Sequence, residues 1–194
     1  MEPKKSSNAK KRCFWAQSDL RIEYHDREWG VPLHEDQKLF EFLILEGAQA
    51  GLSWETILKK REAYRKAFDR FDPKKVAKYD AKKMAKLMKD EGIVRNRLKI
   101  ASAVRNAKAF LEVQKEFGSF DKYVWGFVGG RPIDGKRKGR GDMPAKTEIS
   151  DALSQDLKKR GFNFVGSTII YAFMQATGMV DDHAGECFKR SGGK

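Results

Sequence analysis

Apolar residues along most of the chain recur at helical spacing, and polar or glycine residues mark where the segments begin and end. A nearly continuous apolar run at 39–45 predicts a buried helix, which Asp36 can cap. Ser53 can cap a following helix over 54–68. A longer apolar period over 96–117 predicts a further helix.

Shorter segments also have helical signals, because each combines apolar residues with a capping residue or a glycine stop. One of these helices starts at Asp72-Pro73, and the next runs from Asp80 to Gly92. A third contains Tyr123 and Phe127. The last two run from Ser150 or Asp151 to Gly161 and from Gly166 to Gly178. We find no strand pattern of useful length. The predicted fold is therefore all-α.

One long glycine- and proline-rich break interrupts this pattern, at 129–146. It predicts a mobile basic loop inside a single domain over 12–190, because the helices after it are too few to form a core of their own. Residues 1–11 read as a disordered basic tail. This tail has charges but no apolar core behind them, so we expect no signal peptide and a cytoplasmic, nucleoid-associated protein.

Charge narrows the class of partner. The 194 residues include 40 Lys and Arg against 27 Asp and Glu, which gives a net charge of +13. Such an excess favours polyanions, nucleic acid first. The alternative is a lysine-rich surface with no specific partner. No apolar run approaches membrane-spanning length, so no membrane contact is expected.

The two cysteines of the chain each lie near a histidine. Cys13 precedes His25 at one end, and His183 precedes Cys187 at the other. Two thiols and two imidazoles suit a closed, tetrahedral zinc site that would join the two ends. A Cys13–Cys187 disulfide and two unrelated buried thiols are the alternatives.

A glycine-bounded turn joins two predicted helices near the C-terminus. Between Gly161 and Gly166 the backbone can approach a ligand closely, and free amides follow at Ser167 and Thr168. Free amides at a helix start can bind a DNA phosphate. The segment looks like a helix-hairpin-helix element, and an ordinary turn with a glycine cap is the alternative.

Glu46 is the unusual residue of the apolar run's helix. A carboxylate on such a face is costly unless it is paired or used. It could pair with an arginine or cap a neighbouring helix. Alternatively, it lies at the floor of a pocket, because small residues follow it and Trp54 begins the next helix. An aromatic ring near a carboxylate suits a flat, cationic or amino-bearing ligand.

Several ordered motifs together resemble the 3-methyladenine DNA glycosylase I family. They span Cys13 to Cys187 and are CFW at 13–15, YHDxEWGVP at 24–32, LEGxQAGLSW at 45–54, EGIVR at 91–95, KRGFxFVGST at 159–168, MQA at 174–176 and DH at 182–183. The resemblance implies a helix-hairpin-helix glycosylase with one structural zinc. Its ligands would be Cys13, His25, His183 and Cys187.

The resemblance also implies roles in a base pocket. Glu46 would accept a hydrogen bond from the excised adenine base, Trp54 would stack on it, and Tyr24 would form the pocket wall. Trp15 would help to close the pocket. Some relatives have an aromatic residue where this chain has Arg21, which changes one side of the pocket.

The implied reaction is hydrolysis of the N-glycosidic bond of 3-methyladenine in alkylated double-stranded DNA, as part of base excision repair. Methylation at N3 makes the base a cation, weakens its bond to deoxyribose and favours stacking on Trp54 by up to about 2 kcal/mol. The base is flipped into the pocket, water attacks the anomeric carbon, and free 3-methyladenine is the product. Ser167-Thr168 stands where bifunctional relatives have a lysine, so we expect a monofunctional enzyme. We also expect a monomer.

Leu52 lies in the turn 51–53 beside the pocket residues. An apolar side chain there could fill the gap left by a flipped base, or it could simply pack under the turn. The main rival to the whole interpretation is a non-catalytic, zinc-stabilised DNA-binding protein, which would not need Glu46, Tyr24 and Trp54 together. A zinc hydrolase is disfavoured, because four protein ligands leave no open position on the metal.

Overall fold

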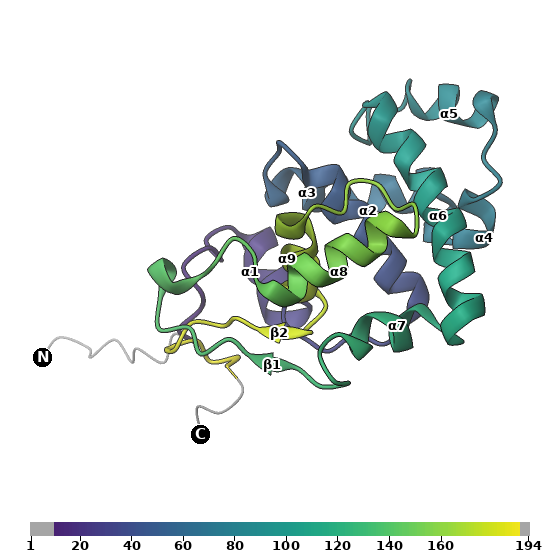
Figure 1. The fold of residues 1–194 in the computed structure, drawn as a ribbon. Helices are drawn as coiled ribbons and strands as arrows, with labels where there is room; N and C mark the ends of the chain where they lie inside the picture. The colour runs from purple at the N-terminus through teal and green to yellow at the C-terminus, as the bar shows by residue number, and fades with distance from the viewer. Residues whose placement is uncertain (1–9, 191–194) are drawn as a thin grey trace, which may run out of the picture.

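The computed structural model describes residues 10–190, which fold into helices and one pair of two-residue strands (Figure 1). The elements are α1 (Asp19–Arg27), α2 (Asp36–Gln49), α3 (Trp54–Ala67), η1 (Asp69–Phe71), α4 (Pro73–Val76), α5 (Ala81–Leu87), α6 (Arg97–Phe117), α7 (Phe120–Gly126), β1 (Ile133–Asp134), η2 (Arg140–Asp142), α8 (Glu148–Lys159), α9 (Ser167–Ala176) and β2 (Val180–Asp181). The predicted all-α class is confirmed. Within this range no helix is both long and apolar enough to cross a bilayer.

Helix α2 lies at the centre of the core. Every residue from Leu39 to Ala48 is buried, because the helix contacts α3, α6, α7 and α9 on different sides. An apolar run without a polar face is what such an environment requires. The prediction of a buried helix there is correct, and it places Glu46 inside the protein.

Most of the predicted caps are present. The Ser53 side chain accepts a hydrogen bond from the Thr56 amide, and Asp72 and Asp80 cap α4 and α5 in the same way. These caps hold because a short polar side chain before a helix satisfies amides that have no partner within the helix.

Asp36 does not cap its own helix. It is the first residue of α2, and its carboxylate accepts hydrogen bonds from the Phe120 and Asp121 amides at 2.9 and 2.8 Å. Asp36 therefore satisfies the first turn of α7, which is distant in sequence. A pattern of neighbouring residues cannot reveal this use of the carboxylate.

Helix α8 begins earlier than predicted. Its cap is Thr147, and the Ser150 side chain bonds back to the Thr147 amide at 2.8 Å. Serine thus takes the place that glutamate or glutamine usually has in a capping box. Neither Ser150 nor Asp151 is the N-cap, because Thr147 takes that place and Ser150 is the third helical residue of the capping box.

Helix α1, the strand pair and the two short 3₁₀ helices η1 and η2 were not predicted from the sequence. Helix α1 is mostly polar, and its buried side chains are those of Tyr24 and His25. The strands β1 and β2 pair in parallel, with Ile133 opposite Val180, and are too short to give an alternating pattern. β1 lies within the basic loop 129–146, so the loop is anchored to the C-terminal part of the chain.

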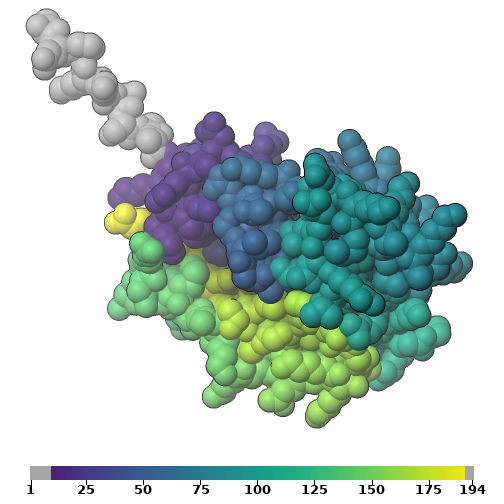
Figure 2. All heavy atoms as spheres, turned by 90° about the horizontal axis from the view of Figure 1, so that it is seen from above, coloured from purple at the N-terminus to yellow at the C-terminus, as the bar shows by residue number. Residues whose placement is uncertain are grey.

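The two ends of the described chain meet. Lys11 pairs with Glu186 at 3.1 Å, and its carbonyl accepts a hydrogen bond from the Phe188 amide at 2.9 Å. The end of the described chain lies against the N-terminal segment in Figure 2, yellow beside purple. Residues 1–9 of the predicted tail lie outside the described residues.

Candidate active site and metal centre

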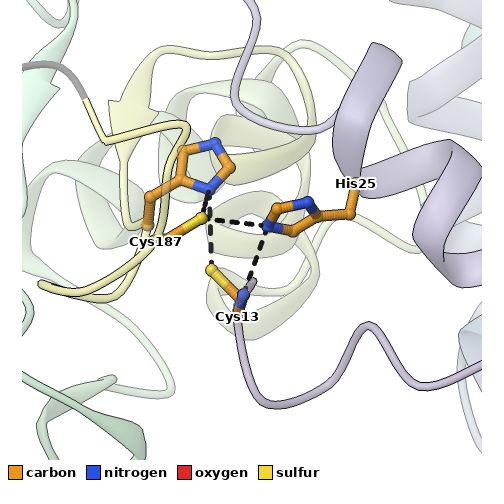
Figure 3. A group of neighbouring side chains, drawn as sticks. Cys13, His25 and Cys187 are labelled. Carbon is orange, nitrogen blue, oxygen red and sulfur yellow. Dashed lines mark hydrogen bonds between the residues drawn. The ribbon is translucent and has the colours of Figure 1, made fainter. Parts of the chain in front are cut away.

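The two Cys/His pairs converge into one buried cluster. Cys13 lies in the segment before α1, His25 on α1, and His183 and Cys187 in the segment after β2 (Figure 3). Their ligand atoms all lie within 4.8 Å of one another. Both cysteines are free thiols, so the structure excludes the alternative of a disulfide between them.

The distances within the cluster fit a tetrahedral metal. Cys13 Sγ and Cys187 Sγ each lie 3.5 Å from His183 Nδ1, and Cys187 Sγ lies 3.3 Å from His25 Nε2. Metal bonds of about 2.3 Å to sulfur and 2.0 Å to nitrogen at a tetrahedral angle place the two atoms about 3.5 Å apart. The four residues can therefore bind a metal ion with little rearrangement.

A carboxylate behind the cluster orients one of the imidazoles. Asp26 Oδ1 lies 2.8 Å from His25 Nδ1 and is itself held by Arg12. The Arg12 guanidinium lowers the pKa of Asp26 to about 2, so this group is a carboxylate and His25 Nδ1 carries a proton. His25 Nε2 then keeps its lone pair for a metal, the usual arrangement behind metal-binding histidines.

Burial works against charge inside the cluster. It raises the pKa of the Cys13 thiol and lowers the pKa of His183 to about 4. Two buried thiolates without a cation would be costly, and a divalent metal would supply the missing positive charge.

Gly30 packs directly against His183. It has φ +74°, and a Cβ at this position would lie 2.7 Å from His183 Nε2.

A cavity of about 270 Å³ opens beside the cluster. Its lining comes from α1, α2, α3, α9 and the segments next to them. The lining residues are Trp15, Arg21, Tyr24, Trp29, Glu46, Gln49, Trp54, Met143, Ala172 and Gln175. The four residues predicted for a base pocket are all among them, and the aromatic walls suit a flat ring.

Glu46 lies in this cavity with its carboxyl group unpaired. Its side chain is buried, with 4% of the residue exposed, and it makes no hydrogen bond or ion pair with any residue from 10 to 190. Burial raises its pKa to about 8. The alternatives of an arginine partner or a capped helix are therefore excluded within the described chain.

Two more polar atoms of the cavity are enclosed without hydrogen-bond partners. They are the Tyr24 hydroxyl and the Trp54 indole nitrogen, on rings whose centroids are 5.5 Å apart. Burial, and then the Glu46 charge, raise the pKa of Tyr24 well above its usual range, so it stays a neutral phenol. Buried polar groups usually have partners, and their absence at one place indicates a binding site.

Trp15 connects the cavity with the metal cluster. Its ring lies 6.2 Å from that of Tyr24 and 5.3 Å from that of His25. Trp29 lines the cavity as well and lies 4.7 Å from the His183 ring. Trp125 is buried in the core, and the exposed His34 stacks on it.

Sequence reasoning missed the roles of Gln49, Met143 and Gln175 in the cavity lining. For Gln175 a signal existed, since it is the one polar side chain of the buried stretch from Phe173 to Ala176. Met143 gave no signal, because only the folded path of the basic loop brings it to the cavity. Arg21 lines the cavity and pairs with Glu55 at 3.1 Å.

The predicted hairpin joins α8 and α9. Gly161 has φ +90°, and both it and Gly166 face open space. The turn is fixed to α6 by two hydrogen bonds between Asn163 and Asn106, of 2.8 and 2.9 Å. The first turn of α9 begins at Ser167 and Thr168, whose amides precede the first bond within the helix.

Nearby basic residues differ in availability. Lys158 and Lys159 are exposed, whereas Arg160 pairs with Glu116 and Asp156.

Leu52 is 41% exposed in the turn between α2 and α3, so it is not packed under that turn.

Known proteins are similar over nearly the whole chain. A family described as methyladenine glycosylase matches residues 15–190. A DNA-3-methyladenine glycosylase from Haemophilus influenzae is 50% identical over 177 residues, which cover 91% of this chain and 96% of that protein. DNA-3-methyladenine glycosylase 1 from Escherichia coli is 49% identical over 94% of this chain and 98% of its own length.

Solved structures have the same fold. A crystal structure of 3-methyladenine DNA glycosylase I superimposes with a TM-score of 0.91 at 48% identity, and covers 93% of this chain and 100% of that one. A variant of 3-methyladenine DNA glycosylase I in complex with 3-methyladenine superimposes with a TM-score of 0.88 at 38% identity, over 90% and 94% of the two chains. With its cavity, its buried cluster and these matches, the chain belongs to the methyladenine glycosylase family.

Proposed function

We propose that the protein is a DNA-3-methyladenine glycosylase, which hydrolyses the N-glycosidic bond of 3-methyladenine in alkylated double-stranded DNA. The observation that carries this proposal is the cavity in which an unpaired carboxyl group, a phenol and an indole lie together among aromatic rings. Solved relatives with the same fold bind 3-methyladenine. These polar groups match a purine that brings its own hydrogen-bonding edge.

Each polar group has a role in base binding. Glu46 accepts a hydrogen bond from the exocyclic amine, and Tyr24 bonds the base from the wall of the pocket. Trp54 stacks on the ring, and Trp15 closes the pocket. An unoccupied carboxyl group with a pKa of about 8 is protonated near neutral pH, and a cationic base next to it favours the carboxylate.

The protein has to do little covalent chemistry. The glycosidic bond breaks with its electron pair going to the base, so the methylated cation leaves as neutral 3-methyladenine. Water adds its oxygen to the anomeric carbon and releases one proton. The cavity binds the cation and excludes adenine that lacks the charge. Ser167-Thr168 offers no amine nucleophile at the hairpin, which supports a monofunctional enzyme.

The metal of the Cys₂His₂ cluster is assigned as one structural zinc ion per chain. Cys13, His25, His183 and Cys187 would hold it, and with four protein ligands it would stabilise the fold without a place for water or substrate. The ion would connect the segment before α1 with the segment after β2. It therefore supports α1, which carries Tyr24 into the cavity.

DNA binding is assigned to the helix-hairpin-helix segment and to Leu52. The amides after Gly166 precede the first hydrogen bond within α9 and can bind a backbone phosphate, and the exposed Lys158 and Lys159 add positive charge near the same turn. Leu52 is exposed at the end of α2, the helix of Glu46, and can fill the space left by the flipped base. We place the enzyme in the cytoplasm with the nucleoid, acting as a monomer.

Release of free 3-methyladenine from methylated duplex DNA tests this function directly. Purified protein should release the base without cutting the DNA backbone, and a chelator should reduce release only as far as it unfolds the protein. A protein that binds DNA and releases no base would instead be the non-catalytic, zinc-stabilised DNA-binding protein. Loss of activity in fully folded, metal-free protein would favour a zinc hydrolase.

A further inference from the structure

Gln175 is a further polar residue of the cavity lining. It lies on α9, opposite the helix that carries Glu46, and is 9% exposed. α2 and α9 pack directly against each other. A glutamine amide has one acceptor and two donors, so its use depends on which end faces the cavity.

A buried carboxylate determines that orientation. Asp182 is fully buried and its Oδ1 is paired with Arg137 Nε at 2.8 Å. Its Oδ2 receives hydrogen bonds from the Tyr171 hydroxyl and from Gln175 Nε2, the latter at 2.7 Å. An ionised carboxylate only accepts, so the glutamine must turn its NH₂ group toward Asp182. The side-chain carbonyl Oε1 then points away from Asp182.

Oε1 of Gln175 has no hydrogen-bond partner among residues 10–190. The side chain lies at the cavity wall, and its nitrogen donates a hydrogen bond to Asp182. The cavity therefore contains a second acceptor of fixed direction besides Glu46. Unlike the Glu46 carboxyl group, this acceptor cannot become a donor, because rotating the amide would place the Gln175 carbonyl oxygen against the carboxylate oxygen of Asp182, two acceptors in opposition.

The chemistry of the base decides what such an acceptor can bind. In 3-methyladenine joined to deoxyribose, N9 holds the sugar, N3 holds the methyl group, and N1 and N7 have lone pairs only. The exocyclic amine is thus the one N–H donor, and it has two hydrogens. Glu46 and Gln175 can each accept one of them. A purine with a carbonyl in place of this amine would place its own acceptor against the acceptors of Glu46 and Gln175.

We propose that Gln175 is a specificity-determining residue, whose carbonyl is fixed by Asp182 and accepts a hydrogen bond from the exocyclic amine of the flipped base. This inference rests on the proposed function. With this contact, the cavity recognises the 6-amino group of the base as well as its methylation. Asp182 is the positioning residue, and Arg137 pairs with it.

A cycle of protein and ligand changes tests the contact. Gln175→Met keeps the length of the side chain but removes the acceptor, and 3-methylpurine is the ligand with hydrogen in place of the amine. Affinity of the free bases is measured by quenching of tryptophan fluorescence. Gln175→Met should weaken 3-methyladenine about 2- to 10-fold, the range of one neutral hydrogen bond, and leave 3-methylpurine within about 2-fold. Equal weakening of both bases would overturn the proposal.

A second pair of variants tests the orientation. Asp182→Asn lets the Gln175 amide rotate, and should therefore reduce the preference for 3-methyladenine over 3-methylpurine as Gln175→Met does. Tyr171→Phe removes one hydrogen bond from the same carboxylate without reversing the amide, and should keep that preference. Melting temperature and metal content are measured for each, because Asp182 adjoins His183. Loss of the preference in Tyr171→Phe but not in Asp182→Asn would contradict the assignment.

Failure of this inference differs from failure of the function. Unmutated protein that releases no base from methylated DNA would refute the proposed function itself. Unmutated protein that releases 3-methyladenine, with Gln175→Met releasing it at the same rate and binding both bases as before, would refute the role of Gln175 alone.

Discussion

Two buried polar regions lie side by side in this protein, and they differ in how many of their polar atoms have partners; within the described chain, the cluster leaves only His183 Nε2 without one. In the Cys₂His₂ cluster the ligand atoms face one another, and Asp26 with Arg12 completes the set behind His25. In the cavity, Glu46 and two further polar atoms have no partner. The first arrangement stabilises a fold, and the second costs stability unless a ligand supplies the partners.

The presence or absence of partners for the buried polar atoms distinguishes a structural region from a binding region. The residue types alone do not make this distinction. Trp15 contacts both, and Trp29 lines one and packs on the other. A substitution in the cluster should therefore act mainly on folding. A substitution in the cavity should act mainly on binding and catalysis, and can even stabilise the empty protein.

The largest effect is expected in the cluster. Cys187→Ser removes a metal ligand and should lower the free energy of unfolding by several kcal/mol, which is a fall in melting temperature on the order of 10 °C. Protein that remains folded should keep most of its turnover. Thermal melts with and without a chelator check this, since the chelator should lower the melting temperature of the unmutated protein and not that of the variant. Metal analysis that finds no zinc in unmutated protein would remove the zinc assignment.

Glu46→Gln should have the largest effect on catalysis. Glutamine keeps the shape but loses the charge, and a charge-assisted hydrogen bond contributes roughly 1.5–3 kcal/mol. Excision of 3-methyladenine should therefore fall by about one to two orders of magnitude, measured as free-base release in single turnover. Metal content and affinity for undamaged DNA should stay near those of the unmutated protein. Excision at full rate would mean that Glu46 is scaffolding.

The pH dependence of stability should also distinguish Glu46. Its pKa rises from an ordinary 4.5 to about 8 on folding, so between these values the folded state holds a proton that the unfolded state has lost. Stability contributed by this proton is complete below about pH 4.5 and decreases as the pH rises toward 8. The melting temperature of Glu46→Gln minus that of the unmutated protein should therefore increase from pH 5 to pH 8.

Glu41, on the same helix, is the matched control for that experiment. It is buried like Glu46 but pairs with Arg61 at 2.6 Å and with Arg65 at 2.8 Å. Glu41→Gln leaves a buried arginine less well paired, so it should lower the melting temperature throughout the range. If both variants shift in the same direction, the contrast between paired and unpaired carboxyl groups does not hold.

The smallest effect is expected at the turn between α2 and α3. Leu52→Ala should slow excision from duplex DNA several-fold, because the gap left by the flipped base would remain unfilled, and should slow excision from single-stranded methylated DNA much less. The affinity for free 3-methyladenine should not change. Equal slowing on both substrates would indicate that Leu52 belongs to the cavity and not to the DNA face.

The sequence predicted those parts of the molecule that depend on local pattern or on rare residue types. The buried helix around Glu46 follows from its apolar run, and the metal cluster was accessible because the chain has only two cysteines. The use of Asp36 across to α7 depends on tertiary contacts, which no local pattern records. Helix α1 was missed because its inward side chains, Tyr24 and His25, are polar or amphipathic and form no apolar stripe.

The cavity lining was predictable only in part for a related reason. Glu46 and Trp54 are close in sequence, and Tyr24 was identified by resemblance. Gln175 and Met143 reach the cavity from segments more than 85 residues further along the chain. Their positions depend on the packing of α9 on α2 and on the anchoring of the basic loop by Arg137.

The joining of both ends of the chain in one cluster has a consequence for synthesis on the ribosome. Cys13 and His25 emerge early, but the site can close only when His183 and Cys187 have also been made. Metal uptake by all four ligands is thus confined to chains translated to the end of the cluster. A chain interrupted before His183 would lack two of the four ligands, so the cluster could form only in chains translated past Cys187.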